Sequence, residues 1–193
     1  MKDIQLDRSR LSDAQRNSTA NRYPCERVNL DFIDTARHRF VSTVDLAITA
    51  EQLFEVLCEA DSWTRWATLL THVTWTSPTP YGVGTTRTVT LRGGTMNDVE
   101  FLAWERCSRM AFRLNQSTSK ALAAFVEDYQ VQETPDGCHV TWTAAITPRG
   151  LTARFGMLVG RPVMALAFKR FASNLRRYTD DRFSVGNTNR PQR

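Results

Sequence analysis

Glu127 and Tyr129 are the two ionisable side chains best suited to acid–base chemistry in this sequence. They share one side of a predicted strand with Phe125 and Val131, because successive side chains of a strand point to opposite faces. If that side faces an apolar interior, burial raises the pKa of the carboxyl group, which suits a general acid or base near neutral pH. Tyr129 could then orient a carbonyl or enolate oxygen. Two alternatives remain: the strand turns its other side inward, or Glu127 pairs with an arginine at the rim.

Arg87 is a candidate anchor for an anionic head group. It shares a side of its predicted strand with Val89 and Leu91, so it could reach into the interior, although a salt bridge at the rim is the alternative. Asp98 and Glu100 lie on the opposite side from the apolar residues of their strand, which predicts that they face solvent.

The remaining candidate ligand contacts are apolar side chains, which give a small-molecule site its shape. Ala144 lies two residues from Trp142, and its small size leaves room for a ligand. The complete predicted ligand-binding set is Trp75, Arg87, Val89, Phe112, Phe125, Trp142 and Ala144 from the strands, with Phe155, Val159 and Val163 from a long terminal helix.

No metal or organic cofactor is predicted. The sequence has no GxSxG, P-loop, GxGxxG or HExxH motif. Its four cysteines form no CxxC pair, which argues against zinc and predicts free thiols in a reducing compartment. His72 is expected to be exposed. Residues 1–21 are polar and carry no apolar signal core, so a cytoplasmic location is expected.

The elements that would position these residues follow from periodicity and turn signals. Alternating apolar residues and Pro/Gly punctuation predict strands at 38–48, 70–77, 85–91, 97–105, 109–116, 121–133 and 138–147. Thr49 is a predicted N-cap for a helix, and Asp61 for a short second one ending at Trp66. Residues 152–182 predict one long helix with a kink near Gly160, because Pro162 lacks a backbone donor. The fold class is therefore α+β: a seven-stranded antiparallel sheet curved around a long C-terminal helix, with two short helices after the first strand.

Composition places the chain among ordinary globular proteins, at 41% hydrophobic and 23% charged residues. We expect residues 1–36 to be a polar tail or docking arm, 37–182 one domain, and 183–193 a disordered tail. The net charge of +5 comes from the segment from Arg161 onward, which we interpret as a solvated helix face, with nucleic-acid or anionic-membrane contact as the alternative. No run of 18 apolar residues exists, so stable membrane insertion is not expected. A homodimer is left open.

Residues 38–182 resemble the SRPBCC superfamily, which includes START lipid-transfer domains, birch-pollen-allergen-like proteins and polyketide cyclase/dehydrase-like proteins. The resemblance rests on the helix start Thr49–Phe54, on Asp61-Ser62-Trp63 followed by Trp66, on Gly82-Val83-Gly84-Thr85, on Gly137–Trp142, and on the long terminal helix. It implies a helix-grip fold with a hydrophobic cavity between sheet and helix. These motifs are specific for the fold and not for a reaction.

Three functions are compatible with these features. The leading hypothesis is binding of a hydrophobic small molecule, such as a lipid, polyketide or other aromatic compound. The second is a cofactor-independent enzyme of the polyketide cyclase/dehydrase type, with Glu127 and Tyr129 in acid–base roles. The third is a ligand-free interaction module that uses the basic terminal helix and the tails.

Overall fold

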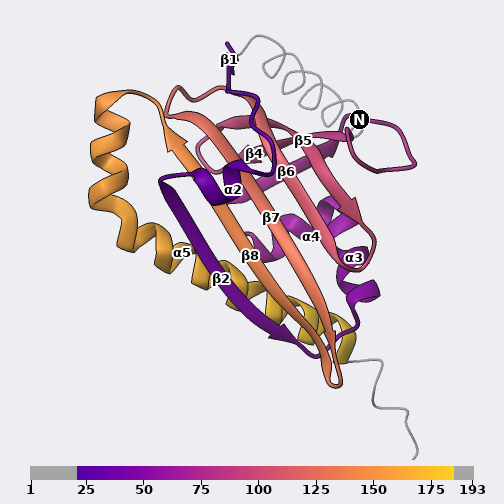
Figure 1. The fold of residues 1–193 in the computed structure, drawn as a ribbon. Coiled ribbons are helices and arrows are strands. Elements are labelled where there is room, and N and C mark those ends of the chain that lie inside the picture. The colour runs from indigo at the N-terminus through magenta and orange to yellow at the C-terminus, as the bar shows by residue number, and fades with distance from the viewer. Residues whose placement is uncertain (1–20, 185–193) are drawn as a thin grey trace, which may run out of the picture.

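The computed structural model describes residues 21–184 and has a curled antiparallel sheet at its centre (Figure 1). The strands follow the order β2-β8-β7-β6-β5-β4-β3, and the two-residue β1 pairs with β6 beside this path. Their bounds are β1 Tyr23–Pro24, β2 His38–Leu46, β3 Leu70–Trp75, β4 Thr86–Leu91, β5 Met96–Glu105, β6 Arg109–Ser117, β7 Leu122–Thr134 and β8 Gly137–Pro148. The seven-stranded path confirms the predicted helix-grip sheet.

Two short helices, α3 (Ala50–Cys58) and α4 (Ala60–Trp66), carry the chain from one edge strand, β2, to the other edge strand, β3. The predicted N-cap is present: the Thr49 hydroxyl accepts a hydrogen bond from the Gln52 amide, and the Gln52 side chain accepts one from the Thr49 amide. Leu53 and Leu57 of α3 are fully buried against the inner face of the sheet. These helices therefore close one side of the interior.

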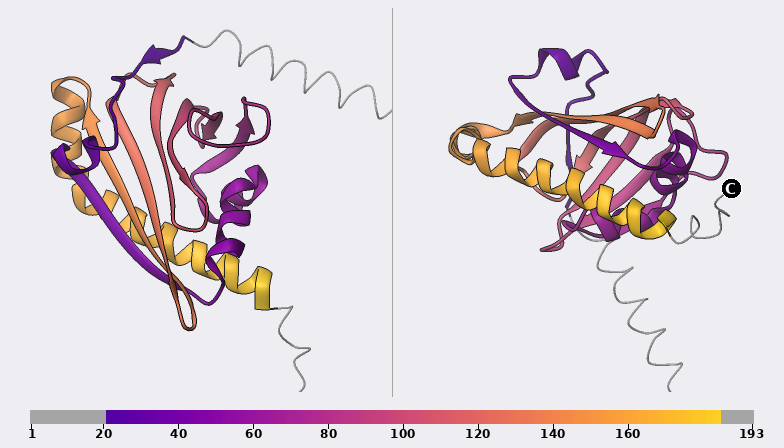
Figure 2. Two further views of the ribbon diagram at one scale, coloured as in Figure 1. Left: turned by 45° about the vertical axis from the view of Figure 1, so that its right-hand side comes forward. Right: turned by 90° about the horizontal axis from the view of Figure 1, so that it is seen from below.

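The long helix α5 (Gly150–Ser184) closes the other side of the interior. Its two halves differ in how deeply their side chains are buried. Figure 2 shows it changing direction after its first turns and then running across the open side of the sheet. The C-terminal half is anchored by buried Phe168, Ala172 and Leu175. Arg182 also forms an ion pair with Glu59, with a nitrogen–oxygen distance of 2.5 Å. Pro162 lies inside the helix, which continues through it.

The N-terminal half of α5 is largely exposed. Leu151, Phe155, Leu158, Val159, Val163 and Leu166 are each 63–82% exposed. By length and composition, Gly150–Phe183 could cross a membrane, and only 6% of its most apolar window is buried. Arg154 and Arg161 interrupt the apolar run without making the segment polar on average, and the expectation of no stable membrane insertion stays a prediction.

The segment before β2, part of the residues 1–36 expected to be a polar tail or docking arm, docks on the outer face of the sheet. A short helix, α2 (Phe32–Thr35), places Ile33 against Val126 of β7 and Ala145 of β8. Arg113 donates a hydrogen bond from Nη1 to the Val28 carbonyl, at 3.2 Å. The disordered tail was predicted to begin at residue 183, but α5 continues to Ser184. Residues 185–193 of that tail and residues 1–20 of the predicted tail or arm lie outside the described residues.

Replacing Ile33 with valine is expected to lower the free energy of unfolding by about 1 kcal/mol, because the side chain is only 5% exposed and one buried methylene is lost. Chemical denaturation measures the change. Val41→Ala is the control, since Val41 is 49% exposed and its truncation is expected to stay within about 0.5 kcal/mol of wild type. Equal stabilities for wild type and Ile33→Val would show that the arm does not dock in solution.

Candidate functional site

An apolar cavity of about 390 Å³ lies between the inner face of the sheet, α4 and α5. Its volume falls in the range of small-molecule sites. Its wall is dominated by aromatic and aliphatic side chains, with Arg87, Asn97, Glu127 and Tyr129 as its charged or strongly polar members. The residues that line it come from six strands, two helices and the loop between α4 and β3: Trp63, Trp66, Ala67, Leu69, Leu70, Arg87, Val89, Leu91, Asn97, Val99, Phe112, Leu114, Leu122, Phe125, Glu127, Tyr129, Trp142, Ile146, Met157, Met164, Ala167, Phe168 and Phe171.

Arg87 lies in this wall with an unpaired guanidinium group. Its side chain is 1% exposed, and within residues 21–184 neither Nε nor Nη1 has a hydrogen-bond partner. The guanidinium carbon lies 4.0 Å from the Trp63 ring centre and 4.8 Å from that of Phe112, so aromatic faces supply part of its stabilisation. Burial lowers the pKa of Arg87 to about 10, and the group therefore keeps its positive charge at neutral pH. The rim salt bridge considered from the sequence is not formed.

Glu127 and Tyr129 face the same cavity and touch each other. The Tyr129 hydroxyl donates a hydrogen bond to Oε2 of Glu127, at 2.9 Å. Burial raises the pKa of Glu127 to about 7, although the Tyr129 hydrogen bond and the Arg87 charge act in the opposite direction. Burial also raises the pKa of Tyr129 above its ordinary value, with the Glu127 charge as a further cause. Near pH 7 the carboxyl group can therefore either give or take a proton.

Several other polar atoms in the cavity wall lack partners. Among the described residues, seven buried side-chain nitrogen or oxygen atoms have no hydrogen bond, and five of them belong to cavity-lining residues: Trp66 Nε1, Arg87 Nε and Nη1, Asn97 Oδ1 and Trp142 Nε1. The Trp142 N–H lies close enough to Glu127 to lower the pKa of that carboxyl slightly, but it forms no well-directed hydrogen bond. Four of these five atoms are donors and Asn97 Oδ1 is an acceptor. Buried polar groups are normally satisfied, so the four donors point to acceptor atoms on a bound molecule.

The structure brings together most of the site predicted from the sequence. Glu127 and Tyr129, together with Arg87, Val89, Phe112, Phe125 and Trp142, line one cavity. Glu127 neither faces away from the interior nor forms an ion pair at the rim, so neither of the two alternatives considered from the sequence holds.

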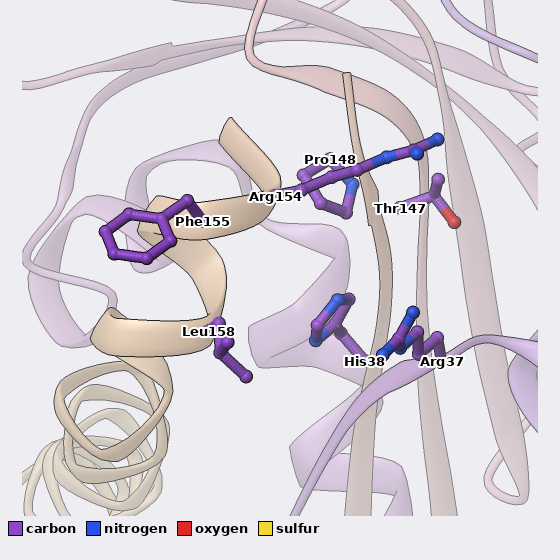
Figure 3. Close-up of a pocket in the computed structure, with 7 residues that line it drawn as sticks. All are labelled: Arg37, His38, Thr147, Pro148, Arg154, Phe155 and Leu158. Carbon is purple, nitrogen blue, oxygen red and sulfur yellow. The ribbon is translucent and has the colours of Figure 1, made fainter. Parts of the chain in front are cut away.

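The other predicted contacts do not line this cavity. Trp75 stacks on Tyr81 with ring centres 4.3 Å apart, and Ala144 is buried beneath the wall. Phe155 lines a separate pocket between α5 and the ends of β2 and β8 (Figure 3), while Val159 and Val163 are 63% and 70% exposed. The expectation failed because this half of α5 is apolar on its outward side as well as on its inward side, so that apolar spacing defines no single inward face.

Residues of the C-terminal half of α5 were missed as ligand contacts, Phe168 and Phe171 among them, as was Asn97. Phe168 and Phe171 belong to the apolar stripe that predicted the helix, so that stripe was a usable signal. No sequence signal pointed to Asn97 as a ligand contact, because a polar residue at the start of a strand is typical of a turn.

The carboxylates predicted to lie away from the interior do so, but they are not free in solvent. Asp98 accepts a bond from Arg22 at 2.5 Å, and Glu100 pairs with Arg113 at 3.0 Å on the outer face. His72 is exposed, as predicted. Within residues 21–184 no group of three or more His, Cys, Asp or Glu side chains is arranged to hold a metal ion. Cys25, Cys58, Cys107 and Cys138 are free thiols.

A curled antiparallel sheet that holds a long helix across an apolar cavity defines the helix-grip class of α+β proteins. Residues 37–180 match the family described as polyketide cyclase/dehydrase and lipid transport. The chain belongs to this family, and through it to the SRPBCC superfamily that the sequence motifs indicated.

The sequence relatives share most of the chain. It is 57% identical over 163 residues to the uncharacterized protein Rv2574 of Mycobacterium tuberculosis strain H37Rv, a match that spans 84% of this chain and 97% of the relative. The uncharacterized protein Mb2604 of Mycobacterium bovis matches equally well, at 57% identity and the same coverage.

Solved structures share the fold at low sequence identity. The di-domain aromatase/cyclase StfQ from the steffimycin biosynthetic pathway superposes with a TM-score of 0.59 at 14% identity, over 76% of this chain and 52% of StfQ. Major latex-like protein 151 of Panax ginseng gives a TM-score of 0.59 at 9% identity, over 75% of this chain and 96% of the ginseng protein.

Proposed function

We propose that the protein binds an amphipathic small molecule in this cavity, with an apolar body against the aromatic wall and an oxygen-bearing, preferably anionic, group at Arg87. The observation that carries the proposal is the buried guanidinium without a hydrogen-bond partner at Nε or Nη1, in a predominantly apolar cavity. A carboxylate or enolate oxygen would give this guanidinium a hydrogen-bond acceptor and neutralise its charge, because guanidinium groups bind planar oxyanions well. The cytoplasmic location expected from the sequence remains a prediction.

Tryptophan fluorescence titration tests this proposal with matched probes. Hexadecanoate and 2-naphthoate carry a carboxylate, while hexadecanol and 2-naphthalenemethanol are their neutral counterparts. Trp63, Trp66 and Trp142 line the cavity, so that a bound probe changes their emission. Saturable binding of either pair supports the apolar site, and tighter binding of the acids supports the anionic anchor. Absence of binding by all four probes, together with absence of any co-purifying apolar molecule in native mass spectrometry, would contradict it.

Filling the cavity provides a test that does not depend on charge. Ala167 lines the cavity from α5, and its replacement by phenylalanine is expected to weaken probe binding at least about tenfold by occupying ligand space. The matched control is Ala121→Phe, the same chemical change at an exposed position outside the cavity, which should bind as wild type does. Equal binding by both variants would place the ligand elsewhere.

A second function is favoured by the Glu127–Tyr129 pair: proton transfer in a cofactor-independent cyclase or dehydrase reaction. With a pKa of about 7, Glu127 could remove a proton from a carbon next to a substrate carbonyl and return it to oxygen. Arg87 would stabilise the enolate oxygen formed between these steps, and Tyr129 would orient Glu127. Glu127→Gln should then abolish turnover of an aromatic polyketide substrate while leaving its binding within about threefold of wild type.

A further inference from the structure

The exposed half of α5 carries an apolar surface and a basic edge on the same few turns. With about 3.6 residues per turn, the six exposed apolar residues named above fall within one continuous arc of the helix. Arg154 and Arg161 are seven positions apart and lie together at one edge of this arc. Met157 and Met164, beyond that edge, line the ligand cavity. The helix therefore presents one side to the cavity and the opposite side to the surroundings.

A basic pocket lies at the base of this surface. It has a volume of about 430 Å³ and is lined by Arg37, His38, Thr147, Pro148, Arg154, Phe155 and Leu158. Figure 3 shows Arg154 extending from α5 over Pro148 toward Thr147, with His38 and Arg37 on the neighbouring strand. His38 is 9% exposed, and its Nδ1 has no hydrogen-bond partner among the described residues. No carboxylate lines the pocket, so it favours an anion.

The charge of the whole segment has one sign. Residues 137–179 contain no aspartate or glutamate and carry seven basic residues: Arg149, Arg154, Arg161, Lys169, Arg170, Arg176 and Arg177. If two copies paired symmetrically through this face, Arg154 and Arg161 of one copy would approach the same arginines of the other copy, without a compensating carboxylate. An anionic bilayer complements both properties, because it takes up apolar side chains below the level of its head groups and attracts Lys and Arg at that level.

We propose that the N-terminal half of α5 is a docking surface for an anionic lipid bilayer, with the pocket formed by Arg37, His38 and Arg154 receiving a lipid phosphate. The helix would lie in the plane of the membrane surface, with Leu158 and Val163 directed into the acyl region. The helix would then lie between the lipid and the cavity wall formed by Met157 and Met164. This docking is independent of which molecule the cavity binds.

Vesicle flotation of the full chain tests the proposal with two compositions, pure phosphatidylcholine and an equimolar mixture of phosphatidylglycerol and phosphatidylcholine. At 0.1 M salt we expect at least about tenfold stronger partitioning into the anionic vesicles, and a loss of this preference at 0.5 M salt. Leu158→Gln combined with Val163→Gln should weaken binding at least about tenfold. Arg154→Gln should weaken binding to anionic vesicles about fivefold. All three positions are exposed, so folding should be unaffected.

Val83→Gln is the matched control, because Val83 is 71% exposed and lies in the loop before β4, at the opposite edge of the sheet from β2. It should float as wild type does. Equal partitioning into both compositions, no partitioning at all, or an equal loss in Val83→Gln would overturn the proposal. So would a dimer mass in light scattering that Leu158→Gln with Val163→Gln converts to a monomer, because the apolar face would then bind a second copy. Ala167→Phe should still float, which separates this proposal from the ligand proposal.

Discussion

Arg87→Met is expected to make the protein more stable and a worse ligand binder. A pKa lowered from 12.5 to about 10 corresponds to about 3 kcal/mol by which the folded environment disfavours the charged side chain. Methionine removes this penalty and also loses the cation–π contacts, which are worth about 1–2 kcal/mol when desolvated. The net gain is about 1–2 kcal/mol, or about 2–6 °C in Tm for a chain of this size. Differential scanning calorimetry measures it.

The same substitution should remove discrimination between acids and alcohols. A ligand carboxylate buried without its cationic partner loses about 3 kcal/mol or more, so the affinity for 2-naphthoate should fall about 100-fold. The affinity for 2-naphthalenemethanol should change less than about threefold, because that probe does not need the charge. A gain in stability combined with a loss of binding is typical of residues retained for function at a free-energy cost.

Arg113→Met is a closely matched control for this prediction. Arg113 is also buried, at 8% exposure, but it pairs with Glu100 at 3.0 Å and bonds to Asn115 at 3.0 Å on the outer face. Its removal leaves a half-buried carboxylate unpaired and should destabilise the protein by about 2–3 kcal/mol without changing ligand affinity. If Arg87→Met destabilises the protein as Arg113→Met does, then Arg87 has a partner in solution and the proposed anchor is wrong.

The contrast between these two arginines also shows what sequence alone could predict. Strand boundaries were predicted to within about two residues, because side-chain alternation and Gly or Pro turns mark them directly. Alternation also placed Arg87 and Glu127 on the inner side of the sheet. It could not show whether an inward arginine is paired, because the partner comes from another element whose relative position depends on packing.

In the long helix α5, by contrast, the sequence pattern could not show which side chains face inward. Periodicity identifies an inward face only where polar residues mark the outward one, as they do around Phe168 and Leu175. From Leu151 to Leu166 the outward side is apolar as well, and the pattern therefore suggested cavity contacts at Phe155, Val159 and Val163 where the structure has exposed side chains. An apolar outward side reflects an interaction other than folding. A single sequence cannot separate such an interaction from core packing, because both place apolar residues on the helix.

Glu127→Gln is expected to change how stability depends on pH. The pKa of Glu127 is raised from 4.5 in the unfolded chain to about 7 in the folded protein, so the folded state binds more protons between these values. The contribution of Glu127 to the free energy of unfolding of the wild type should therefore be largest below about pH 4.5 and fall by about 3 kcal/mol as the pH rises to about 7. Glutamine does not titrate, so the variant should lack this decline and be the more stable protein at pH 8.

Urea denaturation of both proteins at several pH values between 4.5 and 8 measures the difference between the two curves. Glu133→Gln, at an exposed position on the same strand, should follow the wild type throughout. Tyr129→Phe provides a second check, because it removes the hydrogen bond that lowers the pKa of Glu127 and should move the decline to higher pH. A bound apolar ligand should act in the same direction, since it excludes water from the carboxyl group. Parallel curves for wild type and Glu127→Gln would mean that Glu127 is solvated and cannot serve as an acid–base group near neutral pH.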